Sequence, residues 1–188
     1  MDTSDPAPLI LTAMLPPDLH AWATRLRSEH FPPERNHLEA HVTLFHALPG
    51  QYADQVHTRL KRAVAEVPQP EARLVGLMSL GRGTALKLES PQLLALRDDL
   101  AEGFHGLLTA QDQHRPRLHV TIQNKVQPAE AKALQAALAG SIEPRAFRFA
   151  GLALHRYRGG PWEAVREYRF RRRRPGAGDA VRRGRTNG

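Results

Sequence analysis

The chain of 188 residues contains no cysteine and carries a formal net charge of +8. The missing cysteines exclude disulfides, thiolate metal ligands and a cysteine nucleophile, and no apolar run approaches the roughly 20 residues that a membrane-spanning helix needs. Residues 171–188 hold seven arginines and one acidic residue, so residues 1–170 are close to neutral. We expect a soluble, cytoplasmic protein that acts as a monomer and does not bind a membrane.

Hydrophobic periodicity predicts strands and helices that alternate along the chain. Strands are predicted over residues 9–15, 40–48, 73–80, 84–89, 117–126, 146–157 and 163–170, and helices over 18–30, 56–67, 90–107 and 128–138. Proline and glycine pairs separate most of these elements, and Gly81-Arg82-Gly83 is typical of the turn of a hairpin.

The order of these elements indicates an α+β fold with an internal duplication. Each half contains a helix, a strand with the pattern His-x-Thr and another helix, and the strands are expected to form two mainly antiparallel sheets flanked by helices. We expect residues 1–170 to form one domain. Residues 171–188 are expected to be a basic, disordered tail, because their arginine, glycine and proline content offers little apolar surface to bury.

Two segments, one in each half, share a four-residue pattern. The first is His41-Val42-Thr43-Leu44 and the second is His119-Val120-Thr121-Ile122, and of the ten histidines only these two have Thr or Ser two residues later. Side chains at positions i and i+2 of a strand point to the same face. Each histidine is therefore expected to share a face with its threonine, while the aliphatic neighbours face a core.

Two imidazoles and two hydroxyls around one cavity are suited to phosphodiester chemistry. Because the ordinary pKa of histidine is near 6.5, one imidazole can be neutral while the other is protonated. The neutral ring takes a proton from water or a ribose hydroxyl, and the charged ring gives one to the leaving oxygen. The threonine hydroxyls can donate hydrogen bonds to the non-bridging phosphate oxygens. This chemistry requires no cofactor and no metal.

The paired motifs resemble the two-histidine (2H) phosphoesterases, and specifically their 2′-5′ RNA ligase-like branch. The resemblance covers most of residues 9–170 and extends to Phe45-His46-Ala47-Leu48-Pro49 after the first motif and to Gly159-Gly160-Pro161-Trp162-Glu163 near the end. It implies a bilobal fold with an active-site cleft between the lobes. It also implies hydrolysis of RNA-type 2′,3′-cyclic phosphates or 2′-5′ phosphodiesters, with weak reverse 2′-5′ ligation, so that the partners are RNA ends or small nucleotides.

Five further residues are weaker candidates for the site. Strand alternation places Phe45 on the face of the first motif, where it would stack on a base, and Arg117 and Lys125 on the face of the second, where they would hold phosphate charge. By resemblance, Tyr157 and Trp162 would line a substrate pocket. The alternatives are core packing for Phe45, a solvated rim for the two cations and hairpin packing for the two others.

Two other functions stay open at this point. The first is a non-catalytic module that binds RNA or nucleotides in the same cleft. The second is a metal-dependent hydrolase, since His37, His41 and His46 lie close in the sequence. The odd spacing of His41 and His46 places them on opposite faces of a strand, and no carboxylate pair accompanies them, so no metal site is predicted.

Overall fold

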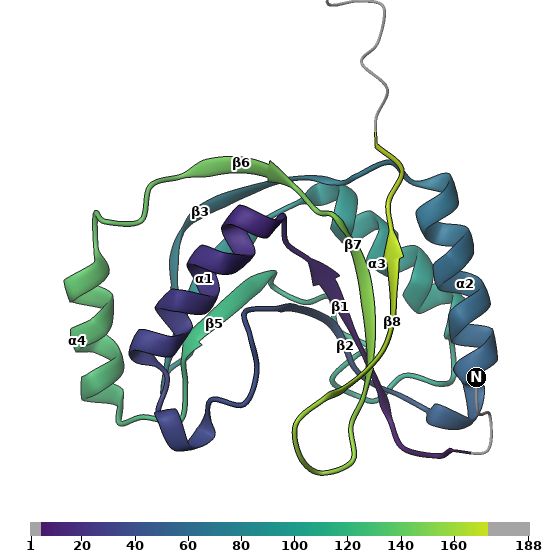
Figure 1. Cartoon of the computed structure of the whole chain (residues 1–188), viewed down its shortest axis with the longest axis horizontal. Coiled ribbons are helices and arrows are strands. Elements are labelled where there is room, and N and C mark those ends of the chain that lie inside the picture. The colour runs from purple at the N-terminus through teal and green to yellow at the C-terminus, as the bar shows by residue number, and fades with distance from the viewer. Residues whose placement is uncertain (1–4, 173–188) are drawn as a thin grey trace, which may run out of the picture.

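The computed structural model describes residues 5–172 (Figure 1). The strands are β1 (Leu9–Met14), β2 (Val42–Leu48), β3 (Glu71–Ser79), β4 (Thr84–Glu89), β5 (His119–Gln123), β6 (Arg145–Arg148), β7 (Gly151–Arg156) and β8 (Glu163–Arg169). The helices are α1 (Pro17–His30), α2 (Ala53–Glu66), α3 (Pro91–Gly103) and α4 (Pro128–Leu138), with two short 3₁₀ turns, Pro33–Arg35 and Gly50–Tyr52. These elements confirm the predicted α+β class.

The strands form two antiparallel sheets of four strands each. The order is β2-β1-β7-β8 in the first sheet and β5-β4-β3-β6 in the second. Both histidine motifs lie on edge strands, β2 in one sheet and β5 in the other, and these two strands contact each other. The duplication expected from the sequence therefore places the two motifs at the junction of the sheets.

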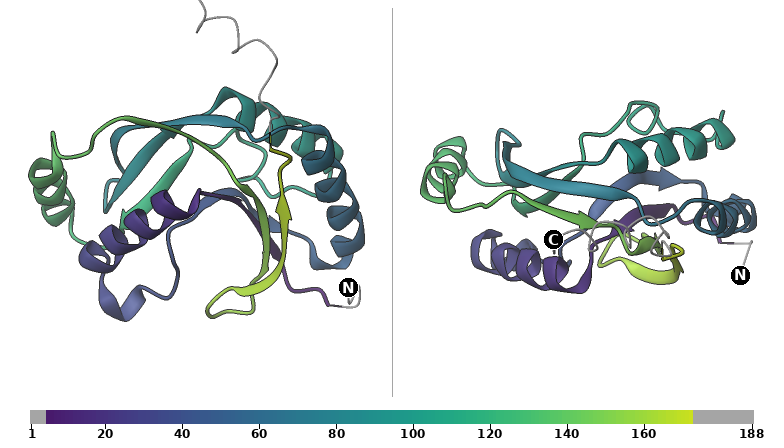
Figure 2. Two further views of the ribbon diagram at one scale, coloured as in Figure 1. Left: turned by 45° about the horizontal axis from the view of Figure 1, so that its top comes forward. Right: turned by 90° about the horizontal axis from the view of Figure 1, so that it is seen from above.

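The helices pack on the sheets through regularly spaced apolar residues. In α2, for example, Val56, Leu60 and Val64 recur at intervals of four and are all buried. Helix α2 contacts β7 and β8, whereas α3 and α4 contact the second sheet. Helix α1, although it precedes β2, contacts β5 of the second sheet, and the views in Figure 2 show it on the opposite side of the molecule from α3. It thereby connects the two halves of the fold.

The predicted strand 146–157 is wrong as a single element, because it divides between the two sheets. Strand β6 pairs with β3, and β7 pairs with β1. The backbone N–H of Phe149 donates to Pro70 O at 3.0 Å, next to the second sheet, and that of Ala150 donates to Met14 O at 2.8 Å in the first. The chain therefore changes sheets between two adjacent residues, which hydrophobic periodicity does not reveal.

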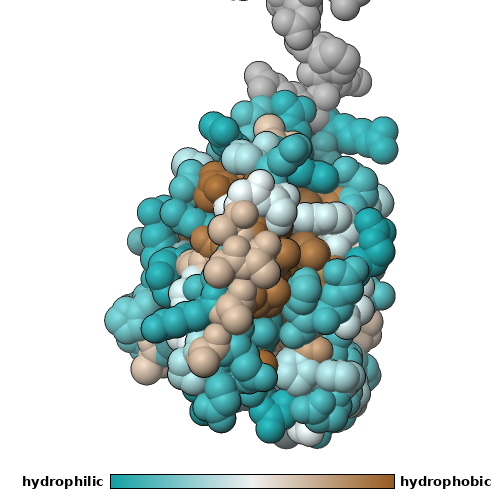
Figure 3. All heavy atoms as spheres, turned by 90° about the vertical axis from the view of Figure 1, so that its left-hand side faces the viewer, coloured by the Kyte–Doolittle hydropathy of each residue, from teal (hydrophilic) through white to brown (hydrophobic). Residues whose placement is uncertain are grey.

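The surface on the side of α4 carries apolar side chains (Figure 3). Four of the five alanines of α4 are exposed, and residues of this helix and of β3 line a cavity of ≈ 380 Å³. Within residues 5–172 no helix has the length and apolar character to cross a membrane. The prediction of a disordered tail falls mostly on residues 173–188, which lie outside the described residues, but Arg171 O accepts a hydrogen bond from Gln69 N at 3.3 Å.

Candidate active site

The two histidines of the motifs lie close together. His41 immediately precedes β2 and His119 is the first residue of β5. The strands of the two motifs, β2 and β5, contact each other, and the charge of His119 is among the causes that lower the pKa of His41. The fold thus brings together two residues that are 78 positions apart in the sequence.

Both imidazoles are held in the same way. Nδ1 of His41 lies 2.8 Å from Glu39 O, and Nδ1 of His119 lies 2.7 Å from Arg117 O, so each ring bonds to the carbonyl two residues upstream. A carbonyl oxygen only accepts, so each Nδ1 carries the hydrogen. Among the described residues neither Nε2 has a hydrogen-bond partner, so each could take a proton from a ligand or give one to it.

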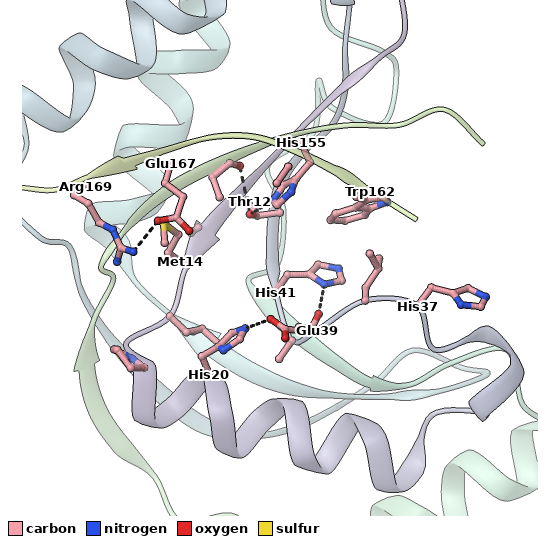
Figure 4. Close-up of a pocket in the computed structure, with 17 residues that line it drawn as sticks. Thr12, Met14, His20, His37, Glu39, His41, His155, Trp162, Glu167 and Arg169 are labelled. Atoms are coloured by element: carbon pink, nitrogen blue, oxygen red, sulfur yellow. Dashed lines mark hydrogen bonds and ion pairs between the residues drawn. The ribbon is translucent and has the colours of Figure 1, made fainter. Parts of the chain in front are cut away.

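A cavity of ≈ 470 Å³ lies beside His41 (Figure 4). Trp162, from the β7–β8 hairpin, stands between two histidines, with its ring centroid 4.7 Å from that of His41 and 5.5 Å from that of His155. The hydroxyl of Thr12 on β1 lies 3.2 Å from Nε2 of His155. The polar residues that line the remainder of this cavity are His20, His37, Glu39, Glu167 and Arg169.

Burial lowers the pKa of His41 to about 4. The hydrogen bond to Glu39 O opposes this effect, and the charges of Arg27, His155 and His119 add to it. His41 is therefore neutral at neutral pH and available as a proton acceptor. Burial also lowers the pKa of His155.

The two threonines of the motifs are half-buried, and neither they nor His119 line the cavity beside His41. Thr43 pairs with Thr12 across β1 and β2, so both side chains lie on the same face of the first sheet. Thr121 pairs with Ala85 on β4, and Lys87, two residues further along β4, pairs with His119. Lys87 is therefore a cation on the same sheet face as the second histidine, a position that sequence spacing did not indicate.

Phe45 does not share the face of Thr43, so the prediction that it stacks on a base is wrong. Thr12 pairs with Thr43, whereas the preceding residue, Leu11, pairs with Phe45. Leu44 is therefore an extra residue on β2, and this β-bulge reverses the alternation beyond it. Phe45 is 0% exposed and belongs to the hydrophobic core.

The placement predicted for Lys125 is also wrong, because β5 ends at Gln123. Lys125 has a φ of 60°, which is left-handed backbone, so strand alternation no longer determines where its side chain points. Arg117 lies before β5 and is exposed, and it contributes its carbonyl oxygen to His119. Tyr157 is 42% exposed and does not line the cavity, in contrast to Trp162.

Three residues near His41 were not identified from the sequence. They are Thr12, Arg27 and His155. Thr12 is an ordinary residue of a buried strand, and a single arginine in a helix or a single histidine in a strand gives no signal of its own. Only the meeting of β1, α1 and β7 around β2 brings them to the site.

The alternative metal site at His37, His41 and His46 finds no support in the geometry. Nδ1 of His46 is 3.0 Å from the buried carboxylate of Asp112, which also accepts hydrogen bonds from two backbone N–H groups. Among residues 5–172 no group of three or more histidine, aspartate or glutamate side chains is arranged to hold a metal ion.

The profile of the 2′-5′ RNA ligase superfamily matches residues 15–161, which is more than half of the chain. The chain belongs to this superfamily. The resemblance of the paired motifs to 2H phosphoesterases is thereby confirmed, and membership identifies the protein as an enzyme of phosphodiester chemistry. Comparison with curated protein sequences gives no match.

Several solved structures share the fold. TT0787 of Thermus thermophilus is 18% identical, with a TM-score of 0.58, and the alignment covers 89% of this chain and 100% of that one. LigT of E. coli, solved with 3′-AMP, is 18% identical with a TM-score of 0.56 over 88% of this chain and 99% of LigT. A further structure, described as a phosphoesterase, has a TM-score of 0.54 at 18% identity and covers 88% of this chain and 99% of its own.

Proposed function

We propose that the protein is a metal-independent phosphodiesterase that hydrolyses RNA-type 2′,3′-cyclic phosphates or 2′-5′ phosphodiesters, with weak 2′-5′ ligation as the reverse reaction. The observation that carries this proposal is the pair of imidazoles, each fixed through Nδ1 to a backbone carbonyl, at the junction of the two sheets. That LigT has been solved with 3′-AMP and with ATP supports a nucleotide as the substrate.

The proposed reaction divides the proton transfers between the two rings. For a cyclic phosphate, a water oxygen attacks phosphorus and the bond from phosphorus to one ribose oxygen breaks. One imidazole accepts the proton of the water through Nε2, and the other donates a proton to the leaving ribose oxygen. Because His41 is neutral before substrate binds, we assign it the role of base and His119 that of acid.

The remaining groups stabilise charge on the phosphate. Thr43 and Thr121, each two residues after its histidine, would donate hydrogen bonds to the non-bridging oxygens. Lys87 would offset the negative charge of the phosphate on the side of His119. Trp162 packs against His41, with 4.7 Å between the ring centroids, and would shield part of that ring from water. The cavity beside Trp162 has the volume to accept the nucleoside of an RNA end.

The direct test is turnover of 2′,3′-cyclic nucleotides in excess chelator. The wild type is expected to open the ring, and His41→Ala and His119→Ala should each lower kcat/KM by about 10²–10⁴-fold. His114→Ala, at an exposed position on the loop before β5, is the matched control and should retain activity. Identification of a 2′- or a 3′-phosphate product shows which bond breaks.

Two outcomes would contradict the proposal. Binding of nucleotides without turnover would make the protein a binding module. Turnover only after addition of a divalent cation would make it a metal-dependent hydrolase.

A further inference from the structure

Arg27 of α1 is a buried cation that bonds to both halves of the molecule. Its Nε donates to Asn36 Oδ1 at 2.8 Å and to Leu38 O at 2.9 Å, and one terminal nitrogen donates to Thr121 O at 2.9 Å. Its guanidinium lies 4.1 Å from the centroid of the Phe31 ring. The side chain is only 4% exposed, and burial lowers its pKa to about 10.

The acceptors of Arg27 belong to the two segments that carry the histidines. Leu38 precedes Glu39, whose carbonyl holds Nδ1 of His41. Thr121 is the threonine of the second motif, two residues after His119. A planar guanidinium with donors in fixed directions sets the distance between its acceptors, which a flexible lysine does not.

We propose that Arg27 is a positioning residue of the catalytic site, which fixes the segment leading to His41 relative to β5 and so sets the separation of the two imidazoles. The inference rests on the proposed function, because it concerns the geometry of that acid–base pair. A neighbouring contact supports it: the hydroxyl of Thr24, one turn earlier on α1, accepts the backbone N–H of Ala40 at 3.1 Å.

Arg27 also leaves a positive charge unneutralised beside the site. None of the acceptors found for it within residues 5–172 is a carboxylate, and its charge is one of the causes that lower the pKa of His41. Burying a cation without a counter-ion is costly. The anionic phosphate of a substrate supplies the missing counter-charge, so the same residue would favour phosphate binding.

The charged and titratable groups that face His41 come from several elements. They are Arg27 from α1, His119 from β5 and His155 from β7. The two carboxylates that line the cavity have other partners: Glu39 lies 3.3 Å from His20, and Glu167 lies 2.7 Å from Arg169. The carboxylates of Glu39 and Glu167 are thus each paired with a cation or a histidine, and the charges that lower the pKa of His41 itself are those of Arg27, His155 and His119.

Two variants separate geometry from charge. Arg27→Lys keeps the charge and loses the planar donor set, so kcat for a 2′,3′-cyclic nucleotide should fall by about 10²-fold while the titration of His41 stays low. Asn36→Asp keeps the hydrogen bond and adds a counter-charge. It should move the titration of His41 to higher pH and raise KM about tenfold, with a smaller effect on kcat.

Arg97 provides the matched control. It is a buried arginine on α3, stacked 4.5 Å from the centroid of the Phe45 ring, and its charge is faced by Asp112. Arg97→Lys makes the same change at an arginine that is equally buried and also packs on a phenylalanine ring. It should leave both the titration of His41 and the ratio of kcat to KM near those of the wild type.

The decisive readout is an NMR titration of the His41 ring, assigned by its loss in His41→Gln, with inorganic phosphate as the added anion. It needs no turnover, so it separates failure of this inference from failure of the proposed function. The inference is overturned if folded Arg27→Lys keeps wild-type kcat, or if Asn36→Asp leaves both the His41 titration and phosphate binding unchanged. Should Arg27→Lys fail to fold, Asn36→Ala takes its place, because it removes one acceptor that holds Arg27 and should also lower kcat.

Discussion

The two histidine motifs have the same local structure and different surroundings. Each ring is held by the carbonyl two residues upstream, at 2.8 Å for His41 and 2.7 Å for His119. Beyond this bond the two sites diverge. His41 lies beneath Trp162 and beside a cavity, whereas His119 has the half-exposed Lys87 opposite it on β4.

This difference shows that the motif determines which nitrogen of each ring carries the hydrogen. The surrounding structure determines the pKa of His41. The carbonyl bond places the hydrogen on Nδ1 in both halves. The pKa of His41 is then lowered by burial and by the charges of Arg27, His155 and His119, all of which lie outside its own four-residue motif. Under the proposed mechanism, two copies of one sequence pattern would supply a base, His41, and an acid, His119.

The largest expected effect is that His119→Ala and His41→Ala respond differently to a change of the leaving group. His119→Ala should lose about 10²–10⁴-fold in kcat/KM with a ribose leaving group and recover most of it with p-nitrophenolate, which departs without a proton. His41→Ala should lose activity with both substrates, because the attacking water still needs a base. If the p-nitrophenolate leaving group instead restored the activity of His41→Ala, His41 would be the acid and His119 the base.

Stability at acid pH should also distinguish His41. Its pKa is about 4 in the folded protein and about 6.5 when unfolded, so the unfolded chain binds a proton that the folded state does not. The free energy of unfolding should therefore fall as the pH drops from about 6.5 to about 4, and His41→Gln should remove about 1–3 kcal/mol of that fall.

Urea unfolding of both proteins between pH 4 and pH 8 measures this effect. At pH 8 the substitution should cause only its pH-independent change in stability. Parallel curves over the whole range would show that burial does not depress the His41 pKa.

Removal of the cover over His41 should have a smaller effect. Trp162→Leu admits water to the ring, which raises the pKa of His41 toward its ordinary value and moves the acidic limb of the kcat/KM profile to higher pH. We expect about a tenfold loss of kcat/KM at pH 6 and less at pH 8. Tyr157→Leu, on the same hairpin but 42% exposed, should leave the profile in place, and an identical shift in both variants would argue against a specific cover.

The smallest expected effect is a difference in KM between Lys87→Ala and Lys125→Ala. Lys87 pairs with His119 across the sheet, whereas Lys125 lies beyond the end of β5. Lys87→Ala should raise KM a few-fold, with a salt dependence weaker than that of the wild type, because a screened surface charge has been removed. Lys125→Ala should leave KM unchanged, and a larger effect of Lys125→Ala in steady-state assays would restore the role expected from its sequence position.

The sequence predicts the parts of this molecule that depend on local pattern. The helices, most strands and the two motifs follow from periodicity and from the repeated His-x-Thr spacing. Phe45 was misplaced because one extra residue, Leu44, shifts the register of β2 against β1, and that bulge depends on the partner strand. The exchange of sheets at Phe149 and Ala150 likewise depends on hydrogen bonds to distant segments.

Arg27 illustrates what local pattern cannot supply. Its position on α1 resembles that of any arginine in an amphipathic helix, and its importance arises from a carbonyl 94 residues away, on β5. The same holds for Thr12 and His155, which reach the site from two other strands of the first sheet. Such residues are identified only once the packing of the halves is known.

The most direct test of the acid–base pair is a crystal structure with a 2′- or 3′-nucleotide product. We expect one phosphate group within hydrogen-bond distance of Nε2 of both His41 and His119, with Nδ1 of each ring still bonded to its carbonyl. A phosphate bound by one ring only, or at a different place with both Nε2 atoms unengaged, would contradict the shared site on which the proposed chemistry depends.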